Sequence, residues 1–462
     1  MTSSETFAVA IDLGSTFIKA GRLTSPTSLE GIVAVPAPPL SGKHGIRQGD
    51  PLEYAAVAER LLRGVLEELP QDVPLGISSQ RSTFLLWDAE AGRPATPLIS
   101  WQDRRAADWC ERHRGHERRV VELTGLMLSA HYAGPKLATL LASEPELRDG
   151  MRRGKLLFGN LESWLIWRAT SGKTHRTDPS MAARTSMFDI ERLDWSDELL
   201  QLFGVPRDGL PEVSATAGRA TPLDGGAVLV ASVADQASGA LAVLDPAASH
   251  ALVTLGTGGF VLRPVAGTAT RQRGYLTAPC LASERKVERT VLEGTINGAG
   301  ATLDRFPGPT RLPETDPSPE AYCLPDVSGL GSPHWRPDLA LTFSSAANTL
   351  DPGGRRRVAV EGLLFRLREI LDDLYPEDPP GRVLVAGGVA RDPQVARGLA
   401  SLLGRPVEVL DERQASLLGA ARLAAGLSPY AAPSTTPVAD GSVGGYLADK
   451  YAGWRRWVDS LL

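Results

Sequence analysis

Blocks of apolar residues separated by short polar turns run through the whole chain, and the clearest pair comes first. Four apolar residues from Ala8 are followed by Asp12, by the turn Gly14-Ser15-Thr16 and by a second apolar block. This pattern predicts a β-hairpin over Ala8–Leu23. Its tip offers backbone amides, two hydroxyls and one acid, which suit phosphate oxygens and hydrated Mg²⁺. Taken alone, an ordinary turn between two strands explains the pattern better.

A second hairpin of the same design strengthens the phosphate interpretation. Ala251–Leu262 again shows an apolar strand, the turn Gly256-Thr257-Gly258-Gly259 and another apolar strand. Similar tips in the two halves of one chain indicate two related domains that face each other. A nucleotide phosphate chain could then be held from both sides. Only the first tip carries an acid, so the two halves are not equivalent.

The alternation of strands and helices continues around these hairpins. Asp50-Pro51 opens a helix with an acid at its cap, and Ala227–Val233 is an apolar strand that runs into Asp235. The pattern also predicts helices over Leu156–Trp167, Val291–Leu303 and Arg355–Leu374, and a flexible connector over Pro429–Val443. Strands that alternate with helices in both halves indicate an α/β architecture. We place one domain over 1–244 and a second over 245–462.

Composition removes several classes of function. The 462 residues carry a net charge of −5 with acids and bases interspersed, which argues against a nucleic-acid surface or a polybasic membrane surface. The longest apolar runs are shorter than a membrane span, and the N-terminus MTSSETF lacks a secretion signal. Three distant cysteines fit neither a disulfide framework nor a zinc site. We therefore expect a protein of the reducing cytoplasm.

Asp235 is the strongest candidate for catalysis. It stands where an apolar strand ends and a helix of small residues begins, which is a ligand-binding position in open sheets. Phosphoryl transfer to a hydroxyl needs a carboxylate that orients the hydroxyl and accepts its proton. The alternative is that Asp235 only caps the following helix.

Other polar positions allow two interpretations each. Gly387-Gly388 lets a flat ligand such as adenine approach the backbone, although a plain left-handed turn is commoner. Asp392 precedes a proline, which favours a helix cap over a nucleotide contact. Arg81 and Trp101 could bind the hydroxyls and the C–H face of a polyol, or serve as a surface ion pair and a core residue.

A series of motifs in one order resembles a known enzyme family. The motifs include IDLGSTFIKAG at Ile11, GISSQRSTFLLWD at Gly76 and DQASGAL at Asp235, and later TLGTGGF, LEGTINGAGAT and AGGVARDPQV. Together they span nearly the whole chain and are similar to the FGGY carbohydrate kinases, most closely to the glycerol-kinase-like branch. The resemblance implies two ribonuclease-H-like domains, of the actin, Hsp70 and sugar-kinase type, with a cleft between them.

The resemblance also implies roles for particular residues. Asp235 would be the general base and Asp12 would lie at Mg²⁺. ATP would be bound by Asp12, Gly14, Ser15, Thr16, Lys19, Gly256, Thr257, Gly300, Asp304, Gly387, Gly388 and Asp392. The substrate would be bound by Arg81, Ser82, Trp101, His131, Asp235, Gln236 and Phe260.

The chain departs from the glycerol kinase pattern at four places. Ser82 replaces an acid, His131 replaces a tyrosine beside which Tyr132 could compensate, and Ala234 replaces a glycine. The segment Asp304–Pro325 is shorter than in typical relatives. The first two changes alter the hydrogen-bonding groups around the substrate hydroxyls, and serine leaves more room.

We therefore expect an enzyme that phosphorylates a terminal hydroxyl of a small polyol or sugar larger than glycerol. Glycerol kinase proper and a xylulokinase-like ketopentose kinase are the enzymatic alternatives. A nucleotide-dependent binding protein and a kinase relative without catalysis are the others. The expected partners are the small substrate and ATP, with no nucleic acid and no membrane, and formation of a homodimer stays open.

Overall fold

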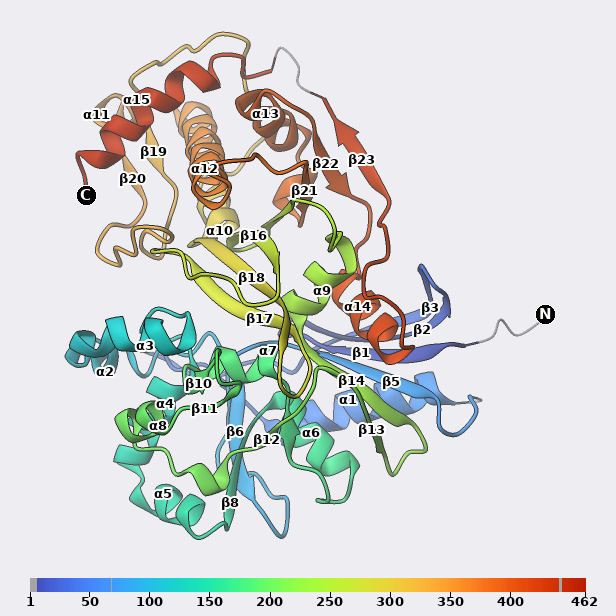
Figure 1. Cartoon of the computed structure of the whole chain (residues 1–462). Coiled ribbons are helices and arrows are strands. Elements are labelled where there is room, and N and C mark those ends of the chain that lie inside the picture. The colour runs from blue at the N-terminus through green and yellow to red at the C-terminus, as the bar shows by residue number, and fades with distance from the viewer. Residues whose placement is uncertain (1–5, 68, 440–442) are drawn as a thin grey trace.

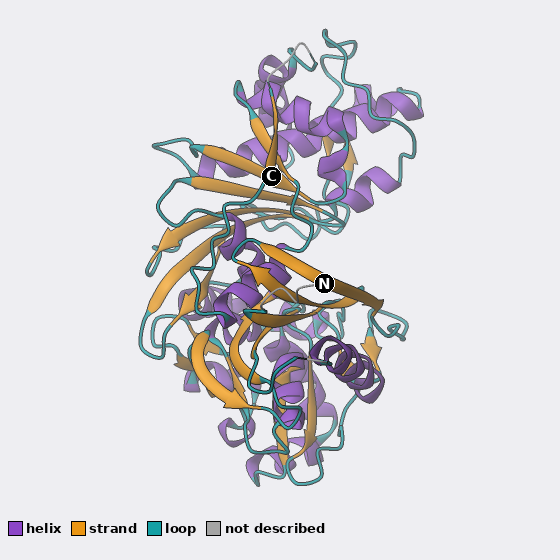
Figure 2. Ribbon diagram, turned by 90° about the vertical axis from the view of Figure 1, so that its right-hand side faces the viewer, coloured by secondary structure: helices purple, strands orange, loops and turns teal. Residues whose placement is uncertain are grey.

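The computed structural model describes residues 6–67, 69–439 and 443–462, so most of MTSSETF and the end of the predicted connector lie outside it. The N-terminal half forms the lower part of the molecule in Figure 1 and the C-terminal half the upper part. Each half is built around one large twisted sheet with helices on its faces, as Figure 2 shows from the side. The predicted α/β architecture is confirmed.

The N-terminal sheet has the strand order β13-β14-β5-β1-β2-β3. Strands β14, β5 and β1 are parallel, whereas β2 and β3 continue antiparallel. Its strands are β1 (Ala8–Leu13), β2 (Phe17–Ser25), β3 (Ser28–Pro36), β5 (Pro74–Ser79), β13 (Ala217–Pro222) and β14 (Val228–Ala234). A smaller sheet beside it consists of β4 (Gln48–Gly49), β7 (Leu98–Ile99), β6 (Phe84–Asp88) and β8 (Leu156–Asn160).

The C-terminal sheet repeats this order as β17-β18-β16-β15-β21-β22-β23. Here β15, β21 and β22 are parallel, and β16 and β18 continue antiparallel. Its strands are β15 (His250–Leu255), β16 (Gly259–Ala266), β17 (Leu276–Ala282), β18 (Val287–Ile296), β21 (Arg382–Ala386), β22 (Val407–Leu410) and β23 (Thr435–Val438). The runs β3-β2-β1-β5-β14 and β18-β16-β15-β21-β22 therefore correspond strand by strand.

Helices cover both sheets and fill the space between them. They are α1 (Pro51–Leu66), α2 (Ala107–Arg112), α3 (Glu117–Thr124), α4 (Ala133–Ser143), α5 (Pro145–Arg152), α6 (Leu161–Ala169), α7 (Pro179–Ala182), α8 (Asp197–Phe203), α9 (Asp235–Val243), α10 (Ala299–Asp304), α11 (Ser345–Asn348), α12 (Pro352–Leu374), α13 (Pro393–Leu403), α14 (Ala415–Ala424) and α15 (Leu447–Asp459). Short strands pair as β9 (Arg176–Thr177) with β12 (Glu212–Val213), β10 (Phe188–Asp189) with β11 (Asp194–Trp195), and β19 (Cys323–Leu324) with β20 (Thr342–Phe343). No helix in these described ranges is long and apolar enough to cross a membrane.

Helix α14 belongs to the C-terminal part of the chain but packs on the N-terminal sheet. Its backbone lies so close to β5 that a side chain at Gly76 would collide with the Ala420 carbonyl. It also packs against α9, where Gly419 meets the Ser238 backbone and the Ser238 hydroxyl donates to the Ser416 carbonyl at 2.6 Å. Buried Leu417, Leu418 and Ala421 join the hydrophobic core between the halves. This contact fixes how the two sheets face each other.

The two predicted hairpins are confirmed, and so is the helix after Asp50, whose side chain accepts bonds from the amides of Leu52 and Glu53. The predicted helix Val291–Leu303 is wrong over most of its length, because β18 runs to Ile296 and only α10 is helical. Gly294 belongs to the strand, where its lack of a side chain lets Ile370 of α12 pack directly on the backbone.

Two further predictions are wrong in part because short strands precede or interrupt the predicted elements. The helix Leu156–Trp167 begins with strand β8 and becomes helical only at Leu161. The connector Pro429–Val443 contains β23, which pairs with β22. The domain boundary at 244/245 falls between α9 and β15 and stays a prediction.

Candidate active site

Three polar side chains meet where the parallel strands of the N-terminal sheet end. Asp12 is near the end of β1, Arg81 follows β5, and Asp235 follows β14. The strands are adjacent and in register, with Asp12 beside Ser78 and Ser79 beside Ala234. Because parallel strands end at the same edge of a sheet, these groups converge there.

Asp12 is nearly buried and held by hydroxyls from both halves of the molecule. One carboxylate oxygen accepts from the Ser78 hydroxyl at 2.8 Å, and the other from the Ser416 hydroxyl of α14 at 3.0 Å. Lys19 lies opposite Asp12 in the hairpin. Burial raises the pKa of Asp12, and the two hydroxyls and Lys19 counteract this. A cation bound beside it would favour the carboxylate form.

Asp235 is the first residue of α9, and the helix has no side-chain cap. Its carboxylate accepts instead from the adjacent Gln236 amide at 2.8 Å. The helix-cap interpretation therefore does not account for Asp235. Although the Asp235 side chain is still 35% exposed, partial burial raises its pKa to about 6; Arg81 opposes this rise and the negative charge of Asp12 adds to it. A carboxylate with this pKa is ionised at neutral pH and still basic enough to accept a proton.

Arg81 lies between two carboxylates. Its Nε is 3.9 Å from Asp235, and its Nη1 is 3.2 Å from Glu293 on β18 of the C-terminal sheet. Arg184 donates to the same Glu293 oxygen at 2.5 Å. Glu293 and Arg184 are buried, and the two guanidinium groups lower the pKa of Glu293 despite this burial. One ion cluster thus joins the two halves at Asp235.

The other predicted substrate residues surround this cluster unevenly. Ser82 is buried with a left-handed backbone (φ 62°), and its hydroxyl donates to the Arg184 carbonyl at 2.9 Å. The Trp101 and His131 rings lie 5.5 Å apart. Burial and the nearby Lys136 lower the pKa of His131 well below its usual value, so the imidazole is neutral at pH 7.

A small cavity of about 20 Å³, enough for about one water molecule, lies beside Arg81 between the halves. Arg81, Arg184, Gln236 and Glu293 give it a polar side, and residues of β16, β17 and β18 give it an apolar side. The side-chain oxygen of Gln236 is buried without a hydrogen-bond partner. Phe260, across the ladder from Thr295 on β18, is half-buried nearby in the sheet. The cavity therefore has unused hydrogen-bonding capacity next to Asp235.

The hairpin tips differ in what supports them. In the first, the carbonyl of Gly14 accepts from the Tyr54 hydroxyl of α1 at 2.8 Å, while the side chain of Thr16 is exposed and that of Ser15 half-exposed. In the second, the amide of Gly300 donates to the carbonyls of Gly256 and Thr257, both at 3.1 Å. A side chain at Gly300 would collide with the Gly256 carbonyl, which explains the glycine at the start of α10.

Gly387 and Gly388 follow β21 beside the second tip. Gly387 has φ +100°, and a side chain there would collide with the Leu255 carbonyl. Gly388 is exposed and faces open space, as does Gly256. Asp392 caps α13 through the Gln394 amide at 3.0 Å, the interpretation that its proline favours. Asp304 ends α10 with an exposed side chain.

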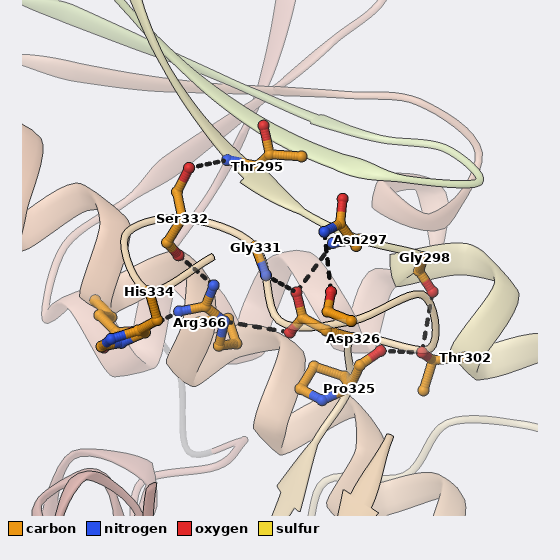
Figure 3. Close-up of polar contacts among 12 residues, drawn as sticks. Thr295, Asn297, Gly298, Thr302, Pro325, Asp326, Gly331, Ser332, His334 and Arg366 are labelled. Carbon is orange, nitrogen blue, oxygen red and sulfur yellow. Dashed lines mark hydrogen bonds and ion pairs between the residues drawn. The ribbon is translucent and has the colours of Figure 1, made fainter. Parts of the chain in front are cut away.

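A buried polar network supports the β18–α10 connection, as Figure 3 shows. Asp326 accepts from the Asn297 amide at 3.0 Å and from the Gly331 amide at 3.1 Å. Arg366 of α12 pairs with the same carboxylate at 3.3 Å and donates to the Ser332 carbonyl. Such a charge is stable in the interior because partners satisfy it on every side. The network anchors the segment that follows Glu293 and leads into α10, whose Gly300 contacts the second tip.

These surroundings fit a bound metal–nucleotide complex. Within the described ranges, no group of three or more acidic, histidine or cysteine side chains could hold a metal alone. Mg²⁺ is commonly held by one or two carboxylates together with phosphate oxygens and water. Asp12 supplies one carboxylate. The first tip has a half-exposed Ser15, and the second faces open space at Gly256, whose own amide donates to the Gly258 carbonyl at 2.9 Å. Mg²⁺ would thus lie at Asp12 and the phosphates between the tips.

Several functional candidates were not identified from the sequence. Glu293 and Arg184 are 109 residues apart, and Ser416 is 404 residues from Asp12. The only sequence signal for Glu293 is an acid within an apolar, glycine-containing run, which is unusual for a buried strand. Tyr132 was noted only as a neighbour of His131; it is buried and lies beside Arg184.

Comparison with known proteins accounts for both halves of the chain. Residues 7–224 match the N-terminal domain model of the FGGY family of carbohydrate kinases, and residues 251–427 match its C-terminal domain model. A glycerol kinase of Methylobacterium nodulans is 32% identical over 494 aligned residues, covering 98% of each chain.

Solved structures show the same fold. The glycerol kinase of Plasmodium falciparum with ADP superposes with a TM-score of 0.83 at 20% identity, covering 98% of both chains. A ligand-bound xylulose kinase of Lactobacillus acidophilus gives a TM-score of 0.83 at 17% identity, with the same coverage. The chain therefore belongs to the FGGY family of carbohydrate kinases, and the expected enzyme class and its cofactors, ATP with Mg²⁺, are confirmed.

Proposed function

We propose that this kinase transfers the γ-phosphoryl group of ATP to a terminal hydroxyl of a small uncharged polyol or sugar, with Asp235 as the general base. The observation that carries the proposal is the convergence of Asp12, Arg81 and Asp235 at one sheet edge, beside a small cavity where the side-chain oxygen of Gln236 has no hydrogen-bond partner. Relatives named glycerol kinase support a polyol, and the xylulose kinase structure supports a ketose equally well in shape.

In the proposed reaction, Asp235 accepts the proton of the substrate hydroxyl while the oxygen attacks the γ-phosphorus. The new O–P bond forms, the bond to the ADP oxygen breaks, and the proton stays on Asp235 until product leaves. Arg81 orients the substrate oxygens, and the hairpin tips donate amides to the phosphates. Mg²⁺, which Asp12 would hold, would neutralise charge on the phosphate oxygens. Packing of the two halves around α9 and α14 limits access of water, which would otherwise compete as acceptor.

The surroundings of Ser82 favour a substrate larger than glycerol. Its hydroxyl proton is already used by the Arg184 carbonyl, so Ser82 offers the substrate less than an acid would. Serine is also smaller than the acid it replaces, which leaves more room for further carbons. The three buried cysteines are unpaired, which supports a reducing cytoplasm. We retain 1–244 and 245–462 as the two domains.

The test is an ADP-release assay over glycerol, tetritols, pentitols, xylulose, ribulose and gluconate. We expect strong turnover with a tetritol, pentitol or ketopentose. Turnover with glycerol alone would contradict our interpretation of Ser82 and His131. No turnover with any of them would contradict the substrate class.

Asp235→Ala should retain ATP binding, measured by calorimetry, and lose phosphorylation by a factor of at least about 10². Asp411→Ala is the matched control, because Asp411 follows the corresponding strand β22 but is exposed and bonded to Ser434 and Thr436. Near-normal turnover of the Asp235 variant would refute the assignment of the base.

A further inference from the structure

The ion cluster around Arg81 has an asymmetry that the proposed reaction does not explain. Arg81 Nε is 3.9 Å from Asp235, which is too far for a hydrogen bond, whereas its Nη1 is 3.2 Å from Glu293. Arginine often pairs with a carboxylate through two parallel bonds, but Arg81 makes no such pair with Asp235. Its guanidinium bonds instead to Glu293.

Glu293 lies on a rigid part of the molecule. It is 2% exposed and stands on β18, which is paired on one side with Leu262 of β16 and on the other with Leu276 of β17. Its carboxylate is also fixed by Arg184, at 2.5 Å. A carboxylate in such a position can hold a flexible guanidinium in one place.

We infer that Glu293 is a positioning residue, supplied by the C-terminal half, which holds Arg81 away from Asp235 and so leaves the Asp235 carboxylate free to bind the substrate hydroxyl. The inference rests on the proposed function of Asp235. Glu293, on the C-terminal sheet, thereby controls the protonation of Asp235, which follows a strand of the N-terminal sheet. Arg81 can then contact the substrate without neutralising the base.

Electrostatics in the cluster agree with this assignment. The charged and titratable groups that face Asp235 are Arg81 after β5, Asp12 on β1, Arg184 before β10 and Tyr54 on α1. Glu293 on β18 reaches it through Arg81. If Arg81 were released, its charge would move onto Asp235, and the pKa of Asp235 would fall from about 6 toward the usual value. The base would weaken and the substrate would have to displace the guanidinium.

The test is the pH dependence of kcat/KM for Glu293→Gln, with ATP and the best substrate of the panel. We expect the acidic limb to move down by about one pH unit and kcat to fall about tenfold. Glu162→Gln is the matched control. Glu162 is fully buried, but it is bonded to Thr177 and Ser163 and is remote from Arg81 in its contacts, so its substitution should leave the limb in place.

A variant that folds more readily keeps the inference testable. Loss of Glu293 leaves Arg184 buried without its partner, which can destabilise the protein. Glu293→Asp keeps the charge and shortens the side chain by one methylene, so it should move the limb in the same direction by a smaller amount. If the acidic limb of both variants lies within about 0.2 pH units of the wild-type limb, the inference is overturned.

A second readout needs no turnover. In full-length protein labelled with ¹³C at aspartate carboxyls, the Asp235 signal, assigned with Asp235→Asn, should titrate lower in Glu293→Gln than in the wild type. If the wild type phosphorylates no member of the panel, the proposed function fails while this titration still decides the role of Glu293. An unchanged titration refutes that role even if the enzyme is active.

Discussion

The two halves of the molecule share one scaffold but end their parallel strands differently. In the N-terminal sheet, β1, β5 and β14 lead to Asp12, Arg81 and Asp235; in the C-terminal sheet, the corresponding β15, β21 and β22 lead to Gly256, Gly387 and Asp411. The first half gathers charge, whereas the second gathers backbone that a ligand can approach closely. We therefore propose that the charged side chains of the first half carry out the reaction, and that the second half supplies a backbone surface for the ligand.

The acids that follow β14 and β22 make the contrast sharp. Asp235 is turned toward Arg81 between the halves, and its pKa is raised to about 6. Asp411 is exposed and accepts from the hydroxyls of Ser434 and Thr436 near β23. Two carboxylates at corresponding positions of the two sheets therefore differ in environment because their neighbours differ.

The largest expected effect comes from removing the acid of the first hairpin, because the second hairpin has no acid at its tip. Asp12→Asn removes the charge proposed to lie at Mg²⁺, and turnover should fall by a factor of about 10²–10³. ADP release measured against Mg²⁺ concentration checks this. Thr254→Val, at the corresponding position of the second hairpin, should retain turnover. Equal losses in the two variants would contradict the division of roles.

Glycine in the second half should matter for stability where it permits close approach. Gly387→Ala forces a side chain into a left-handed backbone against the Leu255 carbonyl, so the free energy of unfolding should fall by about 1–3 kcal/mol. Chemical denaturation measures the difference. Gly388→Ala is the control, because its neighbourhood is open and its backbone ordinary (φ −64°). A loss of stability in the control of the same size would show that the turn is sensitive everywhere.

The pH dependence of kcat/KM should be set by Asp235 and should not change when Asp411 is substituted. A protonated Asp235 cannot accept the substrate proton, so kcat/KM should fall about tenfold per pH unit below an apparent pKa of about 6. Activity should be full above that pH, up to the next titration. In Asp411→Asn the limb should stay where it is. A limb near pH 4 in the wild type would show that Asp235 is not desolvated in solution.

The smallest effect is expected where the second half supports the first. Ser416→Ala removes one of two hydroxyls that donate to Asp12, which costs about 1 kcal/mol and raises the pKa of that carboxyl further. The Mg²⁺ concentration for half-maximal turnover should rise about fivefold. Ser434→Ala removes the corresponding bond to Asp411 and serves as control. No change in the Ser416 variant would leave Ser78 as the sole necessary donor.

Local signals predicted the parts of the fold that depend on neighbouring residues. The turn glycines identified both hairpins, and Asp50-Pro51 identified the start of α1, because caps and turns are encoded within a few positions. The strand–acid–helix pattern likewise located Asp235. The family motifs then predicted the fold of both halves.

Packing between distant segments explains what the sequence did not reveal. The glycine-rich run Val291–Leu303 was predicted as a helix, whereas Gly294 lies in β18 and lets Ile370 of α12 contact that strand. Glu293 has only a weak local signal, an acid in an apolar run, because its partners Arg81 and Arg184 lie 212 and 109 residues away. Periodicity reports which face of an element is apolar, but not which charge from another sheet will meet it.

The position of helix α14 also affects how the chain can fold during its synthesis. The face of β5 at Gly76 is covered by Ala420, a residue synthesised 344 positions later. Until that helix emerges from the ribosome, the N-terminal sheet has an uncovered apolar surface, as in other folds with many long-range contacts. A version ending before residue 415 should therefore aggregate rather than yield a separate N-terminal module, and split or circularly permuted forms will have to keep α14 with β1 and β5.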